Sequence, residues 1–278
     1  AFLGGIASNT NSNLLLNKES DWVVVEADEF DRSFLHLSPF ASIVTAMDPD
    51  HLDVYGDASN FTDGFRQYAM KIDPNGVCVV KEGLSLPTLC PSVSYGIDSE
   101  TADYKGYNLS YIDGEMQFFV DTKSSRRVRF QLGLPGIHNV SNALACIALL
   151  DQLGLPMADI QRGLASFKGV KRRFDVQIKT SDLVYIDDYA HHPEELKSLI
   201  DSLRMMYPEQ KISAVFQPHL YTRTRDFGNA FSEQLSRFDS LILLPIYPAR
   251  EPEIIGISSE WLLSMVRLEN KEVLSSTG

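Results

Sequence analysis

The feature that most constrains the fold is the regular alternation of short apolar runs with segments of helical character. Residues 22–27 (WVVVEA) and 41–46 (ASIVTA) are rich in β-branched side chains and nearly all apolar, which is typical of strands buried on both faces of a parallel sheet. A helix over 61–72 and a strand over 76–80 are predicted next. The repeated order of strand, helix and strand predicts an α/β fold.

A β-hairpin is predicted beside this sheet. Residues 107–112 and 115–120 alternate apolar and polar side chains around Asp113-Gly114, a strong signal for a two-residue turn. A third run, 127–132, is expected to join the hairpin. Helices are predicted over 139–153 and 157–167, where Gly154 and Pro156 end the first of them.

A second domain is expected after residue 167. The chain has 278 residues, which at roughly 150 residues per domain corresponds to about two domains. The basic, glycine-containing stretch 168–173 (KGVKRR) is a plausible linker, so the predicted domains are 1–167 and 168–278. A doubly wound, Rossmann-like second domain is predicted from strands over 174–179, 183–187, 211–217 and 241–246 and helices over 193–206, 223–237 and 258–266.

Composition narrows the possible partners and the cellular compartment. The net charge of -12 argues against a nucleic-acid partner, because phosphate neutralisation needs clustered cations. The sequence lacks the ~20 consecutive apolar residues of a membrane span. Cys78, Cys90 and Cys146 are odd in number and lack a CxxC spacing, so we interpret them as small buried apolar residues of a protein in a reducing cytoplasm.

Two acid-rich loops follow the first two predicted strands. One is 26–31 (EADEFD), and the other, 48–53 (DPDHLD), contains His51. The carboxyl ends of parallel strands meet at one sheet edge, so Glu26 and His51 are candidate ligands of a hard divalent metal. A solvated acidic loop and a surface histidine are the alternatives.

Polar side chains open the predicted helix over 139–153. Asn139 and Asn142 are three residues apart and share a helix face, where two amides could contact the edge of a heterocycle. The alternative is that Asn139 caps the helix. His138 immediately precedes this pair.

Three further groups lie in the second half. Arg172 and Arg173 on the linker could clamp an anion, or could be a solvated pair. The turn 187–195 (DDYAHHPEE) places two acids, a tyrosine and two histidines before a helix that starts at a proline, a density that favours a binding role. Arg223 and Arg225 begin a helix, where cations oppose the helix dipole unless an anion docks there.

Together these segments resemble the Mur ligases, the ATP-dependent enzymes that form amide bonds in peptidoglycan precursor synthesis, and most closely their alanine-adding branch. The resemblance covers essentially the whole chain, and its specificity lies in six motifs that stand in the family's order. These motifs are Glu26-Ala-Asp-Glu29, Asp50-His51-Leu-Asp53, Gly136-Ile-His138-Asn139-Val-Ser-Asn142-Ala143, Gly169-Val-Lys-Arg172-Arg173-Phe174, Asp187-Asp188-Tyr189-Ala-His191-His192-Pro193 and Gln217-Pro-His219-Leu-Tyr221-Thr-Arg223-Thr.

The resemblance implies a fold, a reaction and a role for individual residues. The fold would be the remainder of a P-loop-type ATPase domain, with a mostly parallel sheet plus a β-hairpin, followed by a Rossmann-like domain. The reaction would join L-alanine to the lactyl carboxylate of UDP-N-acetylmuramate through an acyl phosphate, with ATP and Mg²⁺. The implied roles are magnesium binding for Glu26 and His51, adenine contact for His138, Asn139 and Asn142, phosphate contact for Arg173, ribose contact for Asp188 and Tyr189, and contact with the amino acid and the muramyl carboxylate for His192, His219 and Arg223.

The chain departs from the family pattern in three respects. It contains no GxxxxGK[ST] phosphate loop and no counterpart of the domain that holds the uridine diphosphate, so we expect it to be a piece of a longer protein. Leu220 stands where the family usually has arginine, which leaves the anion contact at that point to Arg223. The alternatives are a recycling ligase that adds a murein tripeptide, a metal-dependent hydrolase, and a fragment that only binds adenine.

We expect the 278-residue chain alone to have no ligase activity, because the amides and the lysine of a phosphate-binding loop are missing. The measurement is phosphate release from ATP and Mg²⁺ in the presence of UDP-N-acetylmuramate and L-alanine. Substrate-dependent turnover by the purified chain would contradict this expectation.

Overall fold

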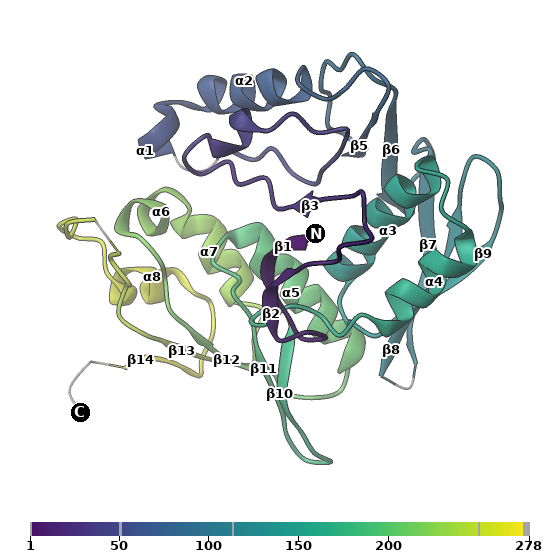
Figure 1. The fold of residues 1–278 in the computed structure, drawn as a ribbon. Coiled ribbons are helices and arrows are strands. Elements are labelled where there is room, and N and C mark those ends of the chain that lie inside the picture. The colour runs from purple at the N-terminus through teal and green to yellow at the C-terminus, as the bar shows by residue number, and fades with distance from the viewer. Residues whose placement is uncertain (1, 50–51, 113, 250, 275–278) are drawn as a thin grey trace. The chain divides into compact units, whose positions relative to one another are not determined.

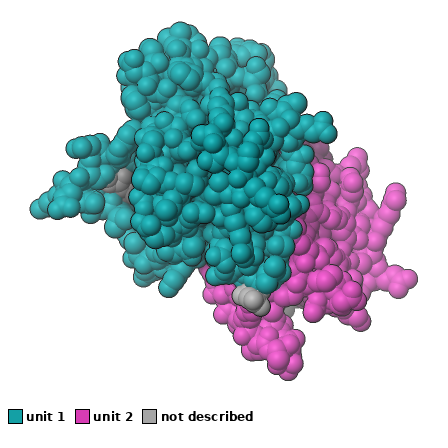
Figure 2. Space-filling model, turned by 90° about the vertical axis from the view of Figure 1, so that its right-hand side faces the viewer, with its two compact units in different colours: residues 1–135, 139–171 teal, residues 136–138, 172–278 magenta. Residues whose placement is uncertain are grey.

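The computed structural model describes residues 2–49, 52–112, 114–249 and 251–274 (Figure 1). The chain forms two compact units. Unit 1 comprises residues 1–135 and 139–171, and unit 2 comprises residues 136–138 and 172–278 (Figure 2). The chain therefore enters unit 2 twice, once for three residues and once for its whole C-terminal part.

Unit 1 is built on a six-stranded sheet of mostly parallel strands. Its first four strands pair in parallel and its last two in antiparallel fashion, which confirms the predicted parallel sheet with an attached hairpin. Gly114 has a φ of 90° in the hairpin turn, a left-handed conformation that glycine adopts without strain. In order across the sheet, the strands are β4 (Ala41–Val44), β5 (Val77–Lys81), β6 (Ser92–Ile97), β7 (Tyr104–Ile112), β8 (Glu115–Asp121) and β9 (Val128–Leu132).

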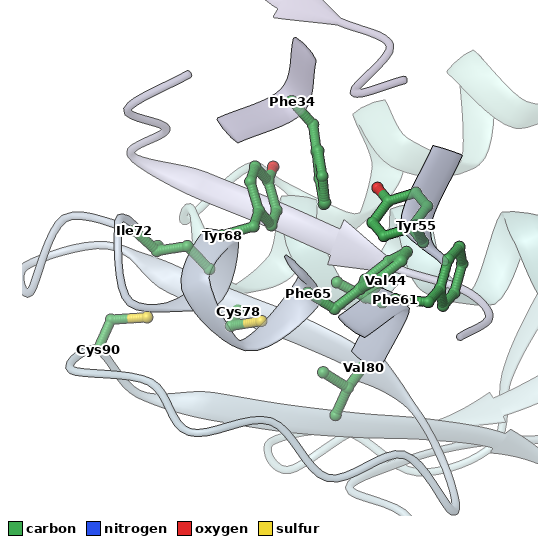
Figure 3. Packing of buried hydrophobic residues seen from close by; sticks show 10 residues of the cluster. All are labelled: Phe34, Val44, Tyr55, Phe61, Phe65, Tyr68, Ile72, Cys78, Val80 and Cys90. Carbon is green, nitrogen blue, oxygen red and sulfur yellow. The ribbon is translucent and has the colours of Figure 1, made fainter. Parts of the chain in front are cut away.

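An aromatic core packs beside the first strands of this sheet (Figure 3). The Phe65 ring lies 5.1 Å from the Phe61 ring and 5.3 Å from the Phe34 ring, measured between centroids. Cys78 and Cys90 are buried in this core as expected, but Cys146 is exposed, so the prediction that it is buried is wrong. The helical elements of this part are η1 (Ser33–His36), α1 (Leu52–Tyr55), α2 (Ala58–Ala69), α3 (Ile137–Gln152) and α4 (Met157–Ser166).

The N-terminal segment differs from the sequence prediction. The strand expected over 22–27 is reduced to β3 (Val24–Val25), which pairs in parallel with β1 (Phe2–Ala7) rather than with β4. Together with β2 (Ser12–Leu15), these strands form a separate sheet of order β2-β1-β3. The Val24 side chain is 57% exposed, so the prediction of a strand buried on both faces is wrong. An apolar run specifies burial only where a neighbouring layer covers it.

Unit 2 contains a hairpin and a parallel sheet. Strands β10 (Asp175–Lys179) and β11 (Val184–Asp187) pair in antiparallel fashion, and β12 (Ser213–Phe216), β13 (Ser240–Leu243) and β14 (Lys271–Val273) pair in parallel. The predicted α/β class is confirmed, although the hairpin forms a sheet of its own. The helices are α5 (Pro193–Met206), α6 (Tyr221–Asp226), α7 (Gly228–Leu235) and α8 (Ser259–Met265).

One predicted helix of unit 2 is broken. The segment expected as a single helix over 223–237 forms α6 and α7, which meet at Phe227 with a φ of -108° and a ψ of 14°. The next residue, Gly228, lies so close to α8 that a β-carbon there would stand 2.5 Å from the Trp261 ring. Packing against Trp261 therefore requires glycine at this position.

Replacement of Phe231 by alanine is expected to lower the free energy of unfolding of unit 2 by about 3–5 kcal/mol, since the ring is 1% exposed and packs against Phe216. Urea unfolding monitored through Trp261 fluorescence in a Trp22→Phe background measures this loss. The matched control is Ile255→Ala, whose side chain is fully exposed and for which we expect a change within about 0.5 kcal/mol. Equal losses in both variants would contradict the prediction.

Candidate functional site

Carboxylates of the acidic loop after β3 accept hydrogen bonds from backbone N–H groups of the same segment. Asp28 Oδ1 accepts a hydrogen bond from the Phe30 backbone N–H at 3.0 Å, and Asp31 Oδ1 accepts one from Ser33 N–H at 2.9 Å. The hydrogen bonds from Ser33 lower the pKa of Asp31. Glu26, the predicted magnesium ligand, is exposed on this loop.

The second predicted metal ligand, His51, lies outside the described residues. The expectation that β3 and β4 deliver their loops to one sheet edge is wrong, because the two strands belong to different sheets. Within the described ranges, no group of three or more His, Cys, Asp or Glu residues could hold a metal ion. Of the two predicted magnesium ligands, the described residues therefore contain Glu26 alone.

The residues at the start of α3 divide between the two units. His138 belongs to unit 2, where the preceding Ile137 N–H donates to Ser202 Oγ at 3.0 Å and the His138 ring lies 6.1 Å from the Phe174 ring. Asn139 and Asn142 belong to unit 1. Asn139 Nδ2 donates to the Pro135 carbonyl at 2.6 Å, a local bond at the helix start, and Asn142 is exposed.

His138 carries a buried ring nitrogen whose hydrogen-bonding capacity is unused. Among the described residues, its Nδ1 has no hydrogen-bond partner. Burial lowers the pKa of His138, an effect that the Asp188 carboxylate opposes and the Arg173 guanidinium reinforces. A neutral imidazole with an unused polar atom suits a contact with a heterocycle such as adenine.

Asp188 links two segments by hydrogen bonds: the one that joins the two units, and the turn after β11. Its Oδ2 accepts the Phe174 N–H and its Oδ1 accepts the Ala190 N–H, each at 2.7 Å. Arg172 and Phe174 have φ values of 62° and 49°, so two non-glycine residues of this segment adopt the left-handed conformation. The hydrogen bond from the Phe174 N–H to Asp188 helps to hold that strained backbone in place.

Arg173 and Tyr189, the predicted phosphate and ribose contacts beside Asp188, are accessible to solvent. Arg173 is exposed, and the neighbouring Arg172 guanidinium lies 4.8 Å from the centre of the Tyr189 ring. Tyr189 is 48% exposed. Unit 2 therefore presents cationic and aromatic groups to solvent here, and groups of this chemistry can contact phosphates and bases.

His192 has a structural role at the start of α5. Its Nδ1 accepts the Glu194 N–H at 3.4 Å, while Glu195 Oε2 accepts the N–H groups of both His191 and His192 at 2.8 and 3.0 Å. These reciprocal bonds form a capping box, and the predicted proline follows in the first turn. The catalytic role predicted for His192 stays a prediction.

The turn after β12 brings His219 and Arg223 together. Arg223 is only 6% exposed, and its Nη1 lies 3.4 Å from His219 Nδ1. The His219 ring is 6.1 Å from that of His191, so the turns after β11 and β12 meet in unit 2 although the two strands belong to different sheets. A buried guanidinium beside two imidazoles is suited to bind an anion.

The sequence analysis did not single out the loop after β13, residues 245–253. Its Tyr247 ring stacks on that of His219, with centroids 5.4 Å apart and an angle of 21°. The only sequence signal would have been its position at the carboxyl end of a predicted parallel strand.

Comparison with known protein families covers both halves of the chain. A model described as the Mur ligase middle domain matches residues 6–150, and one described as the Mur ligase, glutamate ligase domain matches residues 172–275. No helix in the described ranges is long and apolar enough to cross a membrane.

Individual relatives align along nearly all of the chain. A UDP-N-acetylmuramate--L-alanine ligase of Cytophaga hutchinsonii is 45% identical over 281 aligned residues, which cover 99% of this chain and 60% of that protein. One of Christiangramia forsetii is 47% identical and is covered to 59%. The chain thus spans less than two thirds of the length of these relatives.

Solved structures share the fold. The crystal structure of the UDP-N-acetylmuramate-alanine ligase MurC from Thermotoga maritima matches with a TM-score of 0.79 at 26% identity. The match covers 98% of this chain and 60% of the MurC chain. The MurF ligase from Thermotoga maritima, solved with ADP, has a TM-score of 0.72 at 17% identity, with 92% and 58% covered.

The depressed pKa of His138 predicts an acid-sensitive unit 2. Its folded-state pKa lies below the ordinary value of 6.5, so below about pH 6.5 the unfolded chain binds a proton that the folded chain does not, and stability falls. We expect the free energy of unfolding of a His138→Gln variant to fall less between pH 7.5 and 5.5 than that of the wild type. The control is His36→Gln, whose side chain is exposed in unit 1, and identical pH dependence of all three proteins would contradict the prediction.

Proposed function

Because the chain belongs to the Mur ligase family, we propose that the protein containing it joins L-alanine to the lactyl carboxylate of UDP-N-acetylmuramate with ATP. The observation that carries the proposal is the 45–47% identity to ligases of that name over 99% of this chain. The product would be an intermediate of peptidoglycan synthesis, and hence of cell-wall growth and division.

The first step would activate the carboxylate. A carboxylate is a poor acyl donor, so its oxygen would attack the γ-phosphorus of ATP, giving an acyl phosphate and ADP. The exposed Arg173 is the candidate for offsetting charge on the phosphates. His138 Nδ1 is the candidate for an adenine contact, with Asn139 and Asn142 as further candidates, and Asp188 and Tyr189 are candidates near the ribose.

The second step would form the amide. The amine of L-alanine would attack the acyl carbon, and phosphate would leave from the tetrahedral intermediate. Cations aimed at the oxyanion stabilise such an intermediate. The pair of His219 and Arg223 supports this assignment, because a largely buried guanidinium is held in place before any substrate arrives. His192, at the start of α5, is the third candidate for this end of the site.

Mg²⁺ is the proposed companion of ATP, with Glu26 and His51 as its candidate ligands. When bound, it would supply positive charge at the phosphates. The described residues contribute Glu26 alone to this set, so we route no step through the metal. We further propose a cytoplasmic protein without nucleic-acid or membrane partners, consistent with the net charge of -12 and the free cysteines.

The deciding experiment uses the complete product of the gene that encodes this chain. We expect UDP-N-acetylmuramate plus L-alanine to stimulate phosphate release from ATP and Mg²⁺. Stimulation by a murein tripeptide in place of L-alanine would favour the recycling ligase. Metal-dependent hydrolysis without ATP would favour a hydrolase, and both results would overturn the proposal.

Arg223→Lys is expected to lower kcat/KM for UDP-N-acetylmuramate by about 10- to 100-fold, because lysine keeps the charge but loses the planar donor fork. The KM for ATP should stay unchanged. Arg225→Lys is the matched control on the same helix, since Arg225 is exposed and pairs with Asp226. Steady-state kinetics of both variants measure the effect, and equal kinetics would remove Arg223 from the proposed site.

A further inference from the structure

The loop 245–253 contacts the turn 217–224 through Pro245, Tyr247 and Glu251. Gln217 Nε2 donates to the Pro245 carbonyl at 3.2 Å, and the Thr222 N–H donates to the Glu251 carboxylate at 3.0 Å. On the premise of the proposed function, we propose that Tyr247 is a positioning residue that holds the His219 imidazole in register with Arg223 for the reaction. Tyr247 lies outside all six motifs that relate the chain to its family.

Backbone pairing brings Tyr247 to His219. The Tyr247 N–H donates to the Pro218 carbonyl at 2.8 Å, and the Leu220 N–H donates to the Tyr247 carbonyl at 2.9 Å. These bonds form a parallel bridge between His219 and Tyr247 beyond the ends of β12 and β13. The two side chains therefore stand side by side on one face of the extended pair.

The same bonds stabilise an unusual backbone conformation. Leu220 has a φ of 70° and a ψ of 135°, a combination that non-glycine residues rarely adopt. Such a residue persists only where its surroundings determine it. The bond from the Leu220 N–H to Tyr247 is one such restraint, and it lies between His219 and the helix that carries Arg223.

The ring of Tyr247 restrains His219 directly. The stacked pair is 5.4 Å apart, and on another side His219 meets His191 edge-on at 6.1 Å. Tyr247 itself is 52% exposed, so burial of its own ring does not account for its position. The ring contact that the structure gives for Tyr247 is the stack on the His219 imidazole.

Arg223 fixes which nitrogen of His219 carries the proton. A guanidinium only donates hydrogen bonds, so His219 Nδ1, 3.4 Å from Arg223 Nη1, must act as the acceptor. The neutral ring then carries its proton on Nε2. The stack on Tyr247 sets the plane of this ring and with it the direction of the Nε2–H bond.

A second contact of the loop 245–253 restrains the start of α6, the helix that carries Arg223. Glu251 accepts hydrogen bonds from the Thr222 backbone N–H at 3.0 Å and from the Thr222 hydroxyl. Thr222 precedes Arg223 in the first turn of α6. The loop thus restrains His219 through Tyr247 and the start of α6 through Glu251.

The kinetic test uses the complete gene product with Tyr247→Ala, Tyr247→Phe and the control Tyr185→Ala. Tyr185 lies on β11 with the same exposed fraction of 52%. We expect Tyr247→Ala to lower kcat/KM for UDP-N-acetylmuramate and L-alanine by about 3- to 10-fold, the range of an aromatic pair. Tyr247→Phe should rescue activity to within about twofold, and the KM for ATP should not change. Wild-type kinetics of Tyr247→Ala would overturn the proposal.

A double-mutant cycle separates positioning from general destabilisation. In a His219→Ala background, Tyr247→Ala should cause no further loss, because the ring that it positions is absent. Additive losses in the two single variants and the double variant would mean that Tyr247 acts independently of His219, and would overturn the proposal.

An NMR measurement distinguishes failure of this proposal from failure of the proposed function. The imidazole ¹⁵N resonances of His219 should report the Nε2–H tautomer in the wild type and a mixture of tautomers in Tyr247→Ala. An unchanged tautomer in Tyr247→Ala would overturn the positioning role. A wild type that lacks ligase activity but shows the expected tautomer change would overturn only the function.

Discussion

Hydrogen bonding between parallel strands decides where the chemistry of unit 2 gathers. In the β12–β13 pair, Ser213 lies opposite Ser240 and Phe216 opposite Leu243, so both strands end at the same level. The segments that leave them continue side by side as far as His219 and Tyr247. A one-residue change of register would turn each of these side chains to the other face.

The residues of the candidate site also hold the backbone together. Asp188 accepts two backbone N–H groups, and His192 caps α5. These bonds restrict side-chain motion, so the site is arranged before a ligand binds. The candidate-site groups that these bonds do not use include Nδ1 of His138 and the exposed side chains of Arg173 and Tyr189.

Several carboxylates of this acidic chain have a structural role in the described residues. Asp28, Asp31 and Asp188 each accept at least one backbone N–H, and Asp239 accepts that of Ile212 at 2.7 Å. A carboxylate that already satisfies backbone donors in a turn needs no metal to explain its place in the sequence. Acid-rich loops therefore predict turns as readily as they predict metal sites.

Local sequence patterns were enough to predict several helices and strands of this protein. The alternation around Asp113-Gly114 predicted the β7–β8 hairpin, the Ala-rich run predicted α3, and Pro193 predicted the start of α5. The ordered motifs indicated the family, because each depends on residues close together in the chain.

Only the tertiary structure decided which distant segments pair. It placed β3 with β1 instead of β4, separated the β10–β11 hairpin from the parallel sheet, and divided a predicted helix at Phe227. It also brought Tyr247 to His219, although no motif marks Tyr247. The physical reason is that periodicity encodes which face of an element is apolar, whereas the partner that covers this face is set by contacts between residues far apart in the sequence.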